Sequence, residues 1–329
     1  MIGKFFKFLI KDDITSPPWE YFFLQNLDEK EYPLYLAKLF KLNTGESLPL
    51  KYNFKSESWI IDKKKCKTFN QKLQWLKLYG VTDLIRNCTD KVKIRDYISK
   101  KIGLEYLKPV LQIIPGNLKS TFIDNDFTTY FDQINWKELP DSFIIKCNNG
   151  YNWQYIIKNK EKFIQSKKLY NIVKQQTTSW LEHEYWCFDG FQLQYKNIKS
   201  QIIIEEFLAC KNEAVKAIEV YCFNGKPKII KLVHNDVPNN ISMFDENLNN
   251  IDFKFSNREF LVEGQADNLI RKILVLSENI AKDFNFVRVD WLILNKKIYF
   301  NDLNFIPNSG LIQFNQEWNK KLGKYLNLK

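Results

Sequence analysis

The segment FVRVDWLILNKKIYFNDLNF, residues 286–305, decides the expected fold more than any other part of the chain. Its two halves are runs of β-branched and aromatic residues, and the polar triplet Asn295-Lys296-Lys297 lies between them. Two such runs around a short polar turn predict a β-hairpin with strands over 286–294 and 298–305. We therefore expect at least one antiparallel pair of strands late in the chain.

Four polar side chains interrupt the apolar pattern of this hairpin: Arg288, Asp290, Asp302 and Asn304. Successive side chains of a strand point to opposite faces, so the two on each strand share a face, and the hairpin can bring all four together. Two carboxylates and an amide oxygen suit Mg²⁺, which takes its remaining ligands from water and substrate phosphates. Arg288 beside them would offset charge that develops during phosphoryl or acyl transfer. The alternative is a wet hairpin face with incidental salt bridges.

The rest of the chain reads as helices first and a mixed body of helices and strands afterwards. Apolar residues at helical spacing predict helices over 69–78, 94–102 and 267–284. Short apolar runs predict strands over 142–148, 202–208, 217–223 and 228–234, with a tight turn at Asn224-Gly225 between the last two. This order predicts an α+β fold with antiparallel hairpins and excludes a doubly wound parallel sheet.

The composition is that of a globular chain with a large core. The 329 residues are 45% hydrophobic and 26% charged, which excludes long disorder. No apolar run is long enough to span a bilayer, and Met1–Ile10 lacks the features of a secretory signal. The six cysteines form no CxxC motif and neither histidine lies near a cysteine pair, so we expect reduced thiols, a cytoplasmic location and no zinc.

The positive charge is uneven along the chain. The net charge is +11, and residues 1–110 hold 21 basic and 13 acidic residues, a balance of +8. A basic N-terminal third favours an anionic partner, such as a nucleotide, an acidic polysaccharide, a membrane surface or nucleic acid. A solvated lysine-rich surface is an equally good interpretation.

Two lysines on different elements indicate a phosphate site. The sequence has no GxxxxGK[ST], GxGxxG or GxSxG motif, so these two carry the signal. Lys91 follows Thr89-Asp90 at a predicted helix start, where backbone N–H groups and the helix dipole favour phosphate. Lys146 lies at the end of a buried apolar strand, beside the Asn148-Asn149-Gly150 loop, and a buried lysine needs an anion. We prefer a nucleotide phosphate as that anion, and an internal carboxylate is the alternative.

A third feature is Glu205-Glu206-Phe207-Leu208, which ends an apolar strand at the expected hinge between the two halves of the chain. The backbone of such an edge can face an adenine while a carboxylate reaches the ribose. Taken alone this signal is weak.

The order of these features resembles the ATP-grasp superfamily. The hairpin FVRVDWLILNKKIYFNDLNFIPNSG is similar to the metal-site hairpin of D-alanine–D-alanine ligases. The stretches FNQKLQWLKLY, TDKVKIRDYISKKIG, LPDSFIIKCNNGYN, FNGKPKII and PNSGLIQFNQEWNKKLGKYLNL resemble the TupA-like ATP-grasp family of surface-polysaccharide biosynthesis. This resemblance runs from about residue 30 to the C-terminus.

The resemblance implies a role for each of these residues. The contacts to ATP phosphates would come from Lys91 and Lys146, with the loop Asn148–Asn152, including Asn149 and Gly150, closing over them. Adenine and ribose would be held by Glu205, Glu206 and the backbone of Leu208. The Mg²⁺ ligands would be Asp290, Asp302 and Asn304, and Arg288 would stabilise the acyl-phosphate or tetrahedral intermediate. Where the family usually has Asp-Tyr-Lys, this chain has Ala217-Ile218-Glu219, so Glu219 or Glu213 would take the ribose contact.

The implied architecture is an ATP-grasp fold of two α+β subdomains after a mainly helical region, with boundaries at 1–88, 89–204 and 205–329. The implied reaction is ATP- and Mg²⁺-dependent ligation of a carboxylate to an amine through an acyl phosphate. The carboxylate would be a uronic acid of a capsular or other surface polysaccharide or a sugar nucleotide, with no nucleic-acid partner. The enzyme would work in the cytoplasm or at the inner face of the membrane.

Three rival functions stay open. A phosphotransferase of the same fold would leave the phosphoryl group on its product. A sugar-nucleotide glycosyltransferase would use Asp124-Asn125-Asp126 as its metal motif, and the polar hairpin would then have no role. A binding module for anionic glycan or membrane would bind through charge alone, without catalysis.

Overall fold

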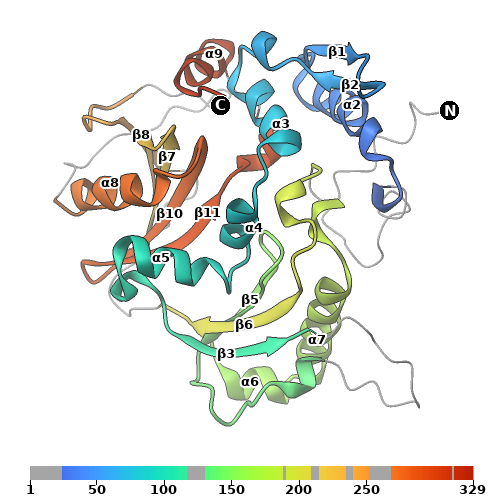
Figure 1. Ribbon diagram of the computed structural model, residues 1–329. Coiled ribbons are helices and arrows are strands. Elements are labelled where there is room, and N and C mark those ends of the chain that lie inside the picture. The colour runs from blue at the N-terminus through green and yellow to red at the C-terminus, as the bar shows by residue number, and fades with distance from the viewer. Residues whose placement is uncertain are drawn as a thin grey trace.

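The computed structural model describes residues 24–116, 130–187, 190–208, 215–234, 240–251, 268–312 and 315–328. Figure 1 shows two sheets with helices packed around them and a smaller N-terminal unit at one end. Asp124-Asn125-Asp126, Glu213 and residues 1–23 lie outside the described residues. Within the part that the structure describes, no helix is long and apolar enough to cross a membrane.

The N-terminal elements are α2 (Tyr32–Thr44), β1 (Leu50–Asn53), β2 (Ser58–Ile61), α3 (Phe69–Tyr79), α4 (Asp83–Thr89) and α5 (Ile94–Ile102). Local signals set several of their ends. Helix α2 ends at Gly45, whose φ of 74° is left-handed, and a capping box between Thr68 and Gln71 starts α3. Besides the expected helices, this region holds the β1–β2 hairpin.

The smaller sheet contains β3 (Val110–Pro115), β4 (Phe143–Cys147), β5 (Gln154–Ile157) and β6 (Gln201–Glu206) in the order β3-β6-β4-β5. All three pairings are antiparallel. Helices α6 (Lys160–Gln165) and α7 (Lys167–Glu182) precede β6, and α7 packs against β4. The expected boundary between residues 204 and 205 falls inside β6.

The larger sheet has the order β11-β10-β7-β8-β9 and is also antiparallel. Its strands are β7 (Lys216–Phe223), β8 (Lys226–His234), β9 (Asn240–Asp245), β10 (Phe286–Leu294) and β11 (Lys297–Asn304). Helix α8 (Asn268–Ala281) covers one face, where the indole of Trp291 donates a hydrogen bond to Ser277 Oγ at 2.8 Å. Both hairpins predicted from the sequence are therefore confirmed, and the α+β class with antiparallel sheets is confirmed with them.

Two hydrophobic cores hold these sheets. One lies between the larger sheet, α3, α5 and α8, and the other lies between the smaller sheet, α2 and α7. Helix α5 belongs to the core of the larger sheet through Ile94 and Ile98, although its place in the sequence precedes the smaller sheet.

Helix α3 is joined to α9 (Gln316–Tyr325) and to the residues on either side of it by buried and part-buried polar contacts, which we call the α3–α9 clasp. The backbone N–H of Asn70 donates to Asn319 Oδ1 at 3.1 Å, and its side-chain amide donates to the carbonyl of Ile312 at 2.6 Å. Lys72 Nζ donates to the carbonyls of Gly323 and Leu326 at 2.7 and 2.6 Å. Residues about 250 positions apart are thus held together at one end of the molecule (Figure 1).

Candidate active site

The polar face of the larger sheet depends on an irregularity between β10 and β11. Near the turn the register pairs Leu294 with Lys297 and Trp291 with Phe300, which would place Asp290 opposite Asn301. The register shifts by one residue there, so that Asp290 lies opposite Asp302. Directly opposed residues of an antiparallel pair share a face, and a one-residue shift exchanges the faces. The bulge therefore brings the polar side chains of both strands to one face.

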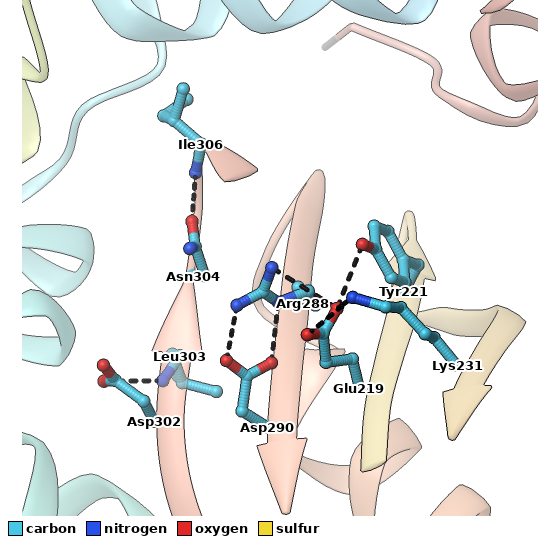
Figure 2. A network of polar contacts seen from close by, with 9 residues as sticks. All are labelled: Glu219, Tyr221, Lys231, Arg288, Asp290, Asp302, Leu303, Asn304 and Ile306. Atoms are coloured by element: carbon cyan, nitrogen blue, oxygen red, sulfur yellow. Dashed lines mark hydrogen bonds and ion pairs between the residues drawn. The ribbon is translucent and has the colours of Figure 1, made fainter. Parts of the chain in front are cut away.

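An ion cluster occupies this face (Figure 2). Arg288 donates two hydrogen bonds to Asp290, from Nε to Oδ1 at 2.7 Å and from a terminal nitrogen to Oδ2 at 2.6 Å. Its other terminal nitrogen lies 3.5 Å from Glu219 Oε2. Glu219 also accepts from Lys231 Nζ at 3.0 and 3.1 Å and from the Tyr221 hydroxyl at 3.2 Å. The prediction that the polar groups of the hairpin share one face is confirmed.

Asp302 and Asn304 lie at the edge of this cluster, on β11. Asp302 Oδ1 accepts the N–H of Leu303 at 2.9 Å, and Figure 2 shows the carboxylate turned away from the Arg288–Asp290 pair. Asn304 Oδ1 accepts the N–H of Ile306 at 3.1 Å. Among the described residues, no group of three or more His, Cys, Asp or Glu side chains could hold a metal ion. A cation here would need the two carboxylates together with phosphate and water oxygens, which is the usual pattern for Mg²⁺.

Burial and neighbouring charges shift the pKa values of the cluster. Burial raises the pKa of Asp290, and Glu219 and Asp302 act in the same direction, against the lowering effect of Arg288. Burial by itself would lower the pKa of Arg288, but Asp290 and Glu219 outweigh it and raise that pKa well above its ordinary value. Arg288 is therefore a permanent positive charge in a nearly dry site.

Glu205 is the centre of a second ion cluster, on the smaller sheet. Lys146 Nζ lies 2.7 Å and Lys108 Nζ 3.2 Å from Glu205 Oε2, while a guanidinium nitrogen of Arg95 lies 3.7 Å from Oε1. The anion that meets the buried Lys146 in this structure is thus an internal carboxylate, where we preferred a phosphate. The Glu205 carboxylate faces three cations, and its expected contact with adenine or ribose stays a prediction.

The protonation of this second cluster follows from burial and pairing. Burial alone would raise the pKa of Glu205, but Lys146 and Lys108 outweigh it and bring the pKa to about 2. Burial and the neighbouring Lys146 lower the pKa of Lys108 to about 8. Burial opposes the charge of Lys146 too, but Glu205 reverses this and raises its pKa. Because one carboxylate faces two lysines, the cluster keeps a positive charge at neutral pH.

Lys91 lies in the turn between α4 and α5, three residues before α5 begins. Its backbone N–H donates to the carbonyl of Asn148 at 3.2 Å, and its ammonium donates to the carbonyl of Gly150. Burial lowers its pKa, while Asp302 acts to raise it. As expected, Asp90 caps this segment: its Oδ1 accepts the N–H of Val92 at 2.9 Å and its carbonyl accepts the N–H of Ile94, where α5 begins after the turn at residues 91–93.

The loop after β4 is held by its own polar contacts. Asn149 is buried, its Oδ1 accepts from Cys147 Sγ at 2.9 Å and its Nδ2 donates to Ser200 Oγ at 3.0 Å. Gly150 leaves no room for a side chain, because a Cβ there would collide with the ring of Trp153. Asn149 thus fixes the loop from within, and Gly150 presents its carbonyl to Lys91.

A cavity of about 360 Å³ lies between the two sheets and joins the two ion clusters. On each sheet the register separates apolar from charged lining residues: Ile144 lies opposite Ile156 on the smaller sheet, and Ala217 lies opposite Leu292 on the larger. Two positions along the same strands the cavity lining is charged, with Lys146 on β4 and with Glu219 opposite Asp290 on the larger sheet. Of the predicted site residues the cavity contains Lys91, Lys146, Leu208, Glu219, Arg288, Asp290 and Asp302. Asn149, Gly150, Glu205, Glu206 and Asn304 do not line this cavity, and Glu206 is exposed.

Several cavity residues were not expected from the sequence. Lys108 bridges Glu205 and Asn301 Oδ1, the latter at 3.0 Å, and lies in a stretch with no recognisable motif. Tyr151, next to Gly150, faces the Arg288 cluster, and burial raises its pKa while Arg288 acts to lower it. Lys231 does not line the cavity, but a register shift between β7 and β8 pairs it with Glu219, which does.

The structure thus has two antiparallel sheets that enclose a cavity. The cavity is apolar at one end, and at the other end it has cations opposite carboxylates. This is the arrangement of an ATP-grasp enzyme. The chain belongs to the TupA-like ATP-grasp family, whose model matches residues 71–327. It is accordingly an ATP-grasp enzyme.

Solved structures give more distant likenesses. D-alanine–D-alanine ligase from Bacillus anthracis, complexed with ATP, is 15% identical with a TM-score of 0.37, and the match covers 77% of this chain and 69% of that one. The corresponding ligase from Helicobacter pylori is 15% identical with a TM-score of 0.41, over 84% and 77% of the two chains. N5-carboxyaminoimidazole synthase from Aspergillus clavatus is 9% identical with a TM-score of 0.35, over 67% and 45%. No curated protein gives a significant match.

Proposed function

We propose that this protein uses Mg·ATP to join a carboxylate of a surface glycan, a uronic acid, to an amine. A carboxylate oxygen of the glycan would attack the γ-phosphorus of ATP, forming an oxygen–phosphorus bond as the bond from that phosphorus to the bridging oxygen breaks and ADP leaves with its electrons. The amine would then attack the acyl carbon of the acyl phosphate. Phosphate leaves with the bonding electrons, the nitrogen loses a proton to solvent, and an amide remains.

The observation that carries this proposal is the matched polarity of the two cavity walls. Both walls are apolar at one end, which suits a nucleobase, and both are charged at the other, which suits phosphates. On the smaller sheet the charged end is cationic, and on the larger sheet carboxylates stand beside Arg288. A nucleotide, which has an apolar base at one end and phosphates at the other, therefore fits between the two cavity walls in only one orientation.

The chain offers residues for each part of Mg·ATP. Lys91, Lys108 and Lys146 would hold the phosphates, since an ammonium has three donors and Lys146 uses one of them on Glu205. Asp290, Asp302 and Asn304 would hold Mg²⁺, whose chemistry is to neutralise phosphate oxygens and fix their orientation. Arg288 would offset the negative charge that develops on the acyl group, from a position already set by Asp290.

The glycan part of the proposal rests on charge. The first 110 residues carry a balance of +8, from 21 basic and 13 acidic residues, which favours an anionic polymer or sugar nucleotide. ATP is supplied in the cytoplasm, so we place the reaction there, with the inner face of the membrane as the site where a growing surface glycan would be met.

The test combines binding with turnover. Mg·ATP should raise the melting temperature of the wild type, and Asp302→Ala should remove the part of this effect that depends on Mg²⁺. Phosphate release should then need both a uronic acid and an amine from a panel. ADP formation with a stable phosphorylated product, and no free phosphate, would show a phosphotransferase. Binding of Mg·ATP without dependence on any uronic acid would reject the substrate class.

A further inference from the structure

The β1–β2 hairpin carries an exposed aromatic cluster that the active site does not use. Phe54, in its turn, is 86% exposed, and Tyr52 and Trp59 are 41% and 40% exposed. Tyr52 and Trp59 are directly opposite in the register, so they share a face. The Tyr52 ring meets those of Phe54 and Trp59 edge to face, with centroids 5.1 and 5.7 Å apart. Figure 1 shows the hairpin at the outer end of the N-terminal unit, beside α2.

The surroundings of this cluster are basic. Residues 50–67 contain six lysines against Glu57 and Asp62, a balance of +4. Lys55 lies in the hairpin turn, and Lys63–Lys65 form an exposed short helix directly after β2. Lys51 lies on the opposite face of β1 from Tyr52, 3.9 Å from Asp62. Exposed aromatic rings surrounded by lysines combine an apolar contact with an attraction for anions.

We propose that the β1–β2 hairpin docks on an anionic lipid surface. Trp and Tyr favour the level of the headgroups, and an apolar ring that stands out from a turn can enter the acyl boundary. Lysines beside it gain about 1 kcal/mol each from an anionic surface. Neither signal alone anchors a protein stably, and this hairpin has both.

The contacts within the hairpin favour a lipid surface over a sugar chain. Recognition of sugar hydroxyls needs polar side chains with free hydrogen-bonding groups. At this turn part of that capacity is already used, because Asn53 Oδ1 accepts the N–H of Lys55 at 3.1 Å and one hydroxyl of the Ser56–Ser58 pair donates to the other at 2.8 Å. The aromatic rings are inclined by 80° and 76° to one another, so they form no flat platform for a sugar ring.

The experiment is co-sedimentation of the full chain with phosphatidylcholine vesicles that contain or lack phosphatidylglycerol. We expect binding to the anionic vesicles that weakens with added salt. Phe54→Ser should weaken it roughly tenfold by removing the inserted ring. The double variant Lys55→Glu, Lys64→Glu should weaken it by more than about tenfold, because two attractions become repulsions.

Matched controls separate this surface from general effects. Leu104→Ser removes an apolar side chain that is 72% exposed on another part of the molecule. Lys167→Glu, Lys168→Glu makes the same change of net charge, from +11 to +7, on exposed residues at the start of α7. Both controls should bind vesicles as the wild type does, and every variant should keep the wild-type thermal response to Mg·ATP, which shows that it is folded.

Two results would overturn the proposal. One is that the hairpin variants bind anionic vesicles as strongly as the wild type, or that the wild type does not bind them. The other is that the hairpin variants lose binding to a soluble polyuronate, such as polygalacturonate, but keep binding to vesicles. That second result would assign the hairpin to a glycan.

Discussion

Glu205→Gln would remove the negative charge that three cations share at the smaller sheet. Lys146 and Lys108 are 2.7 and 3.2 Å from one of its oxygens, and Arg95 is 3.7 Å from the other. Glutamine keeps the size of the side chain but cannot offset buried ammonium groups. We expect a less stable protein, because in this structure the carboxylate faces the lysines.

The size of the effect follows from the pKa of Glu205. Lowering that pKa from 4.5 to about 2 corresponds to about 3 kcal/mol in favour of the charged, folded form. Breaking a buried ion pair by removing one partner typically costs 3–5 kcal/mol, which agrees. Because the pKa is lowered on folding, this stabilisation is complete above about pH 4.5 and is lost as the pH falls toward about 2.

Urea unfolding at neutral pH measures this loss directly. Glu205→Gln should lower the free energy of unfolding by about 3 kcal/mol. Glu206→Gln is the matched control, since its exposed side chain should change stability by less than about 0.5 kcal/mol. If Glu205→Gln is instead as stable as the wild type and its KM for ATP rises, Glu205 binds the nucleotide and does not serve mainly to stabilise the fold.

Three other predictions test the cavity. Arg288→Lys should lower kcat by roughly 100-fold and leave ATP affinity nearly unchanged, because lysine cannot make the paired contact with Asp290; an unchanged kcat in steady-state kinetics would contradict this. Affinity for ATP, measured by calorimetry, should fall as the pH rises through about 8, where Lys108 loses its positive charge, and Lys108→Met should flatten that dependence. Gly150→Ala should destabilise the protein by about 1–3 kcal/mol, because the new methyl group meets the Trp153 ring, and an unshifted melting temperature would refute the crowding argument.

The hairpins could be predicted from the sequence because their signals are local. Alternating polar residues in 286–305 and the Asn224-Gly225 turn each act within a few residues, and the structure has β10–β11 and β7–β8 at these places. Asn224 and Gly225 both adopt left-handed φ, 48° and 83°, as a tight hairpin turn requires.

The contacts between ion partners could not be predicted, for two physical reasons. Lys146 and Glu205 are 59 positions apart, and only the pairing of β4 with β6 brings them together. The pairing of Lys231 with Glu219 depends on a β-bulge. Continuing the register set by the turn would place Ile230 opposite Glu219, and a shift between Tyr221 and Cys222 replaces it with Lys231. No residue type at these positions indicates that the strand contains an extra residue.

The β1–β2 hairpin was missed for a third reason. Its strands have four residues each, which is too short for a clear alternation, and they lie between two strongly helical segments. Its aromatic residues, which would normally indicate a core, are exposed. A pattern of hydrophobicity alone cannot distinguish a buried aromatic side chain from one that is exposed on the surface.

The α3–α9 clasp makes the order of synthesis matter for this protein. Helix α3 leaves the ribosome early, yet Asn70 and Lys72 find their partners only when residues 312–326 have been made. Until then the apolar side of α3, with Phe69 and Leu73, lacks the packing that covers it in the finished molecule. Contacts over such a sequence separation form slowly and leave surface exposed to aggregation meanwhile. The nascent chain thus carries an uncovered apolar face on α3 for most of its synthesis, until residues 312–326 have been made.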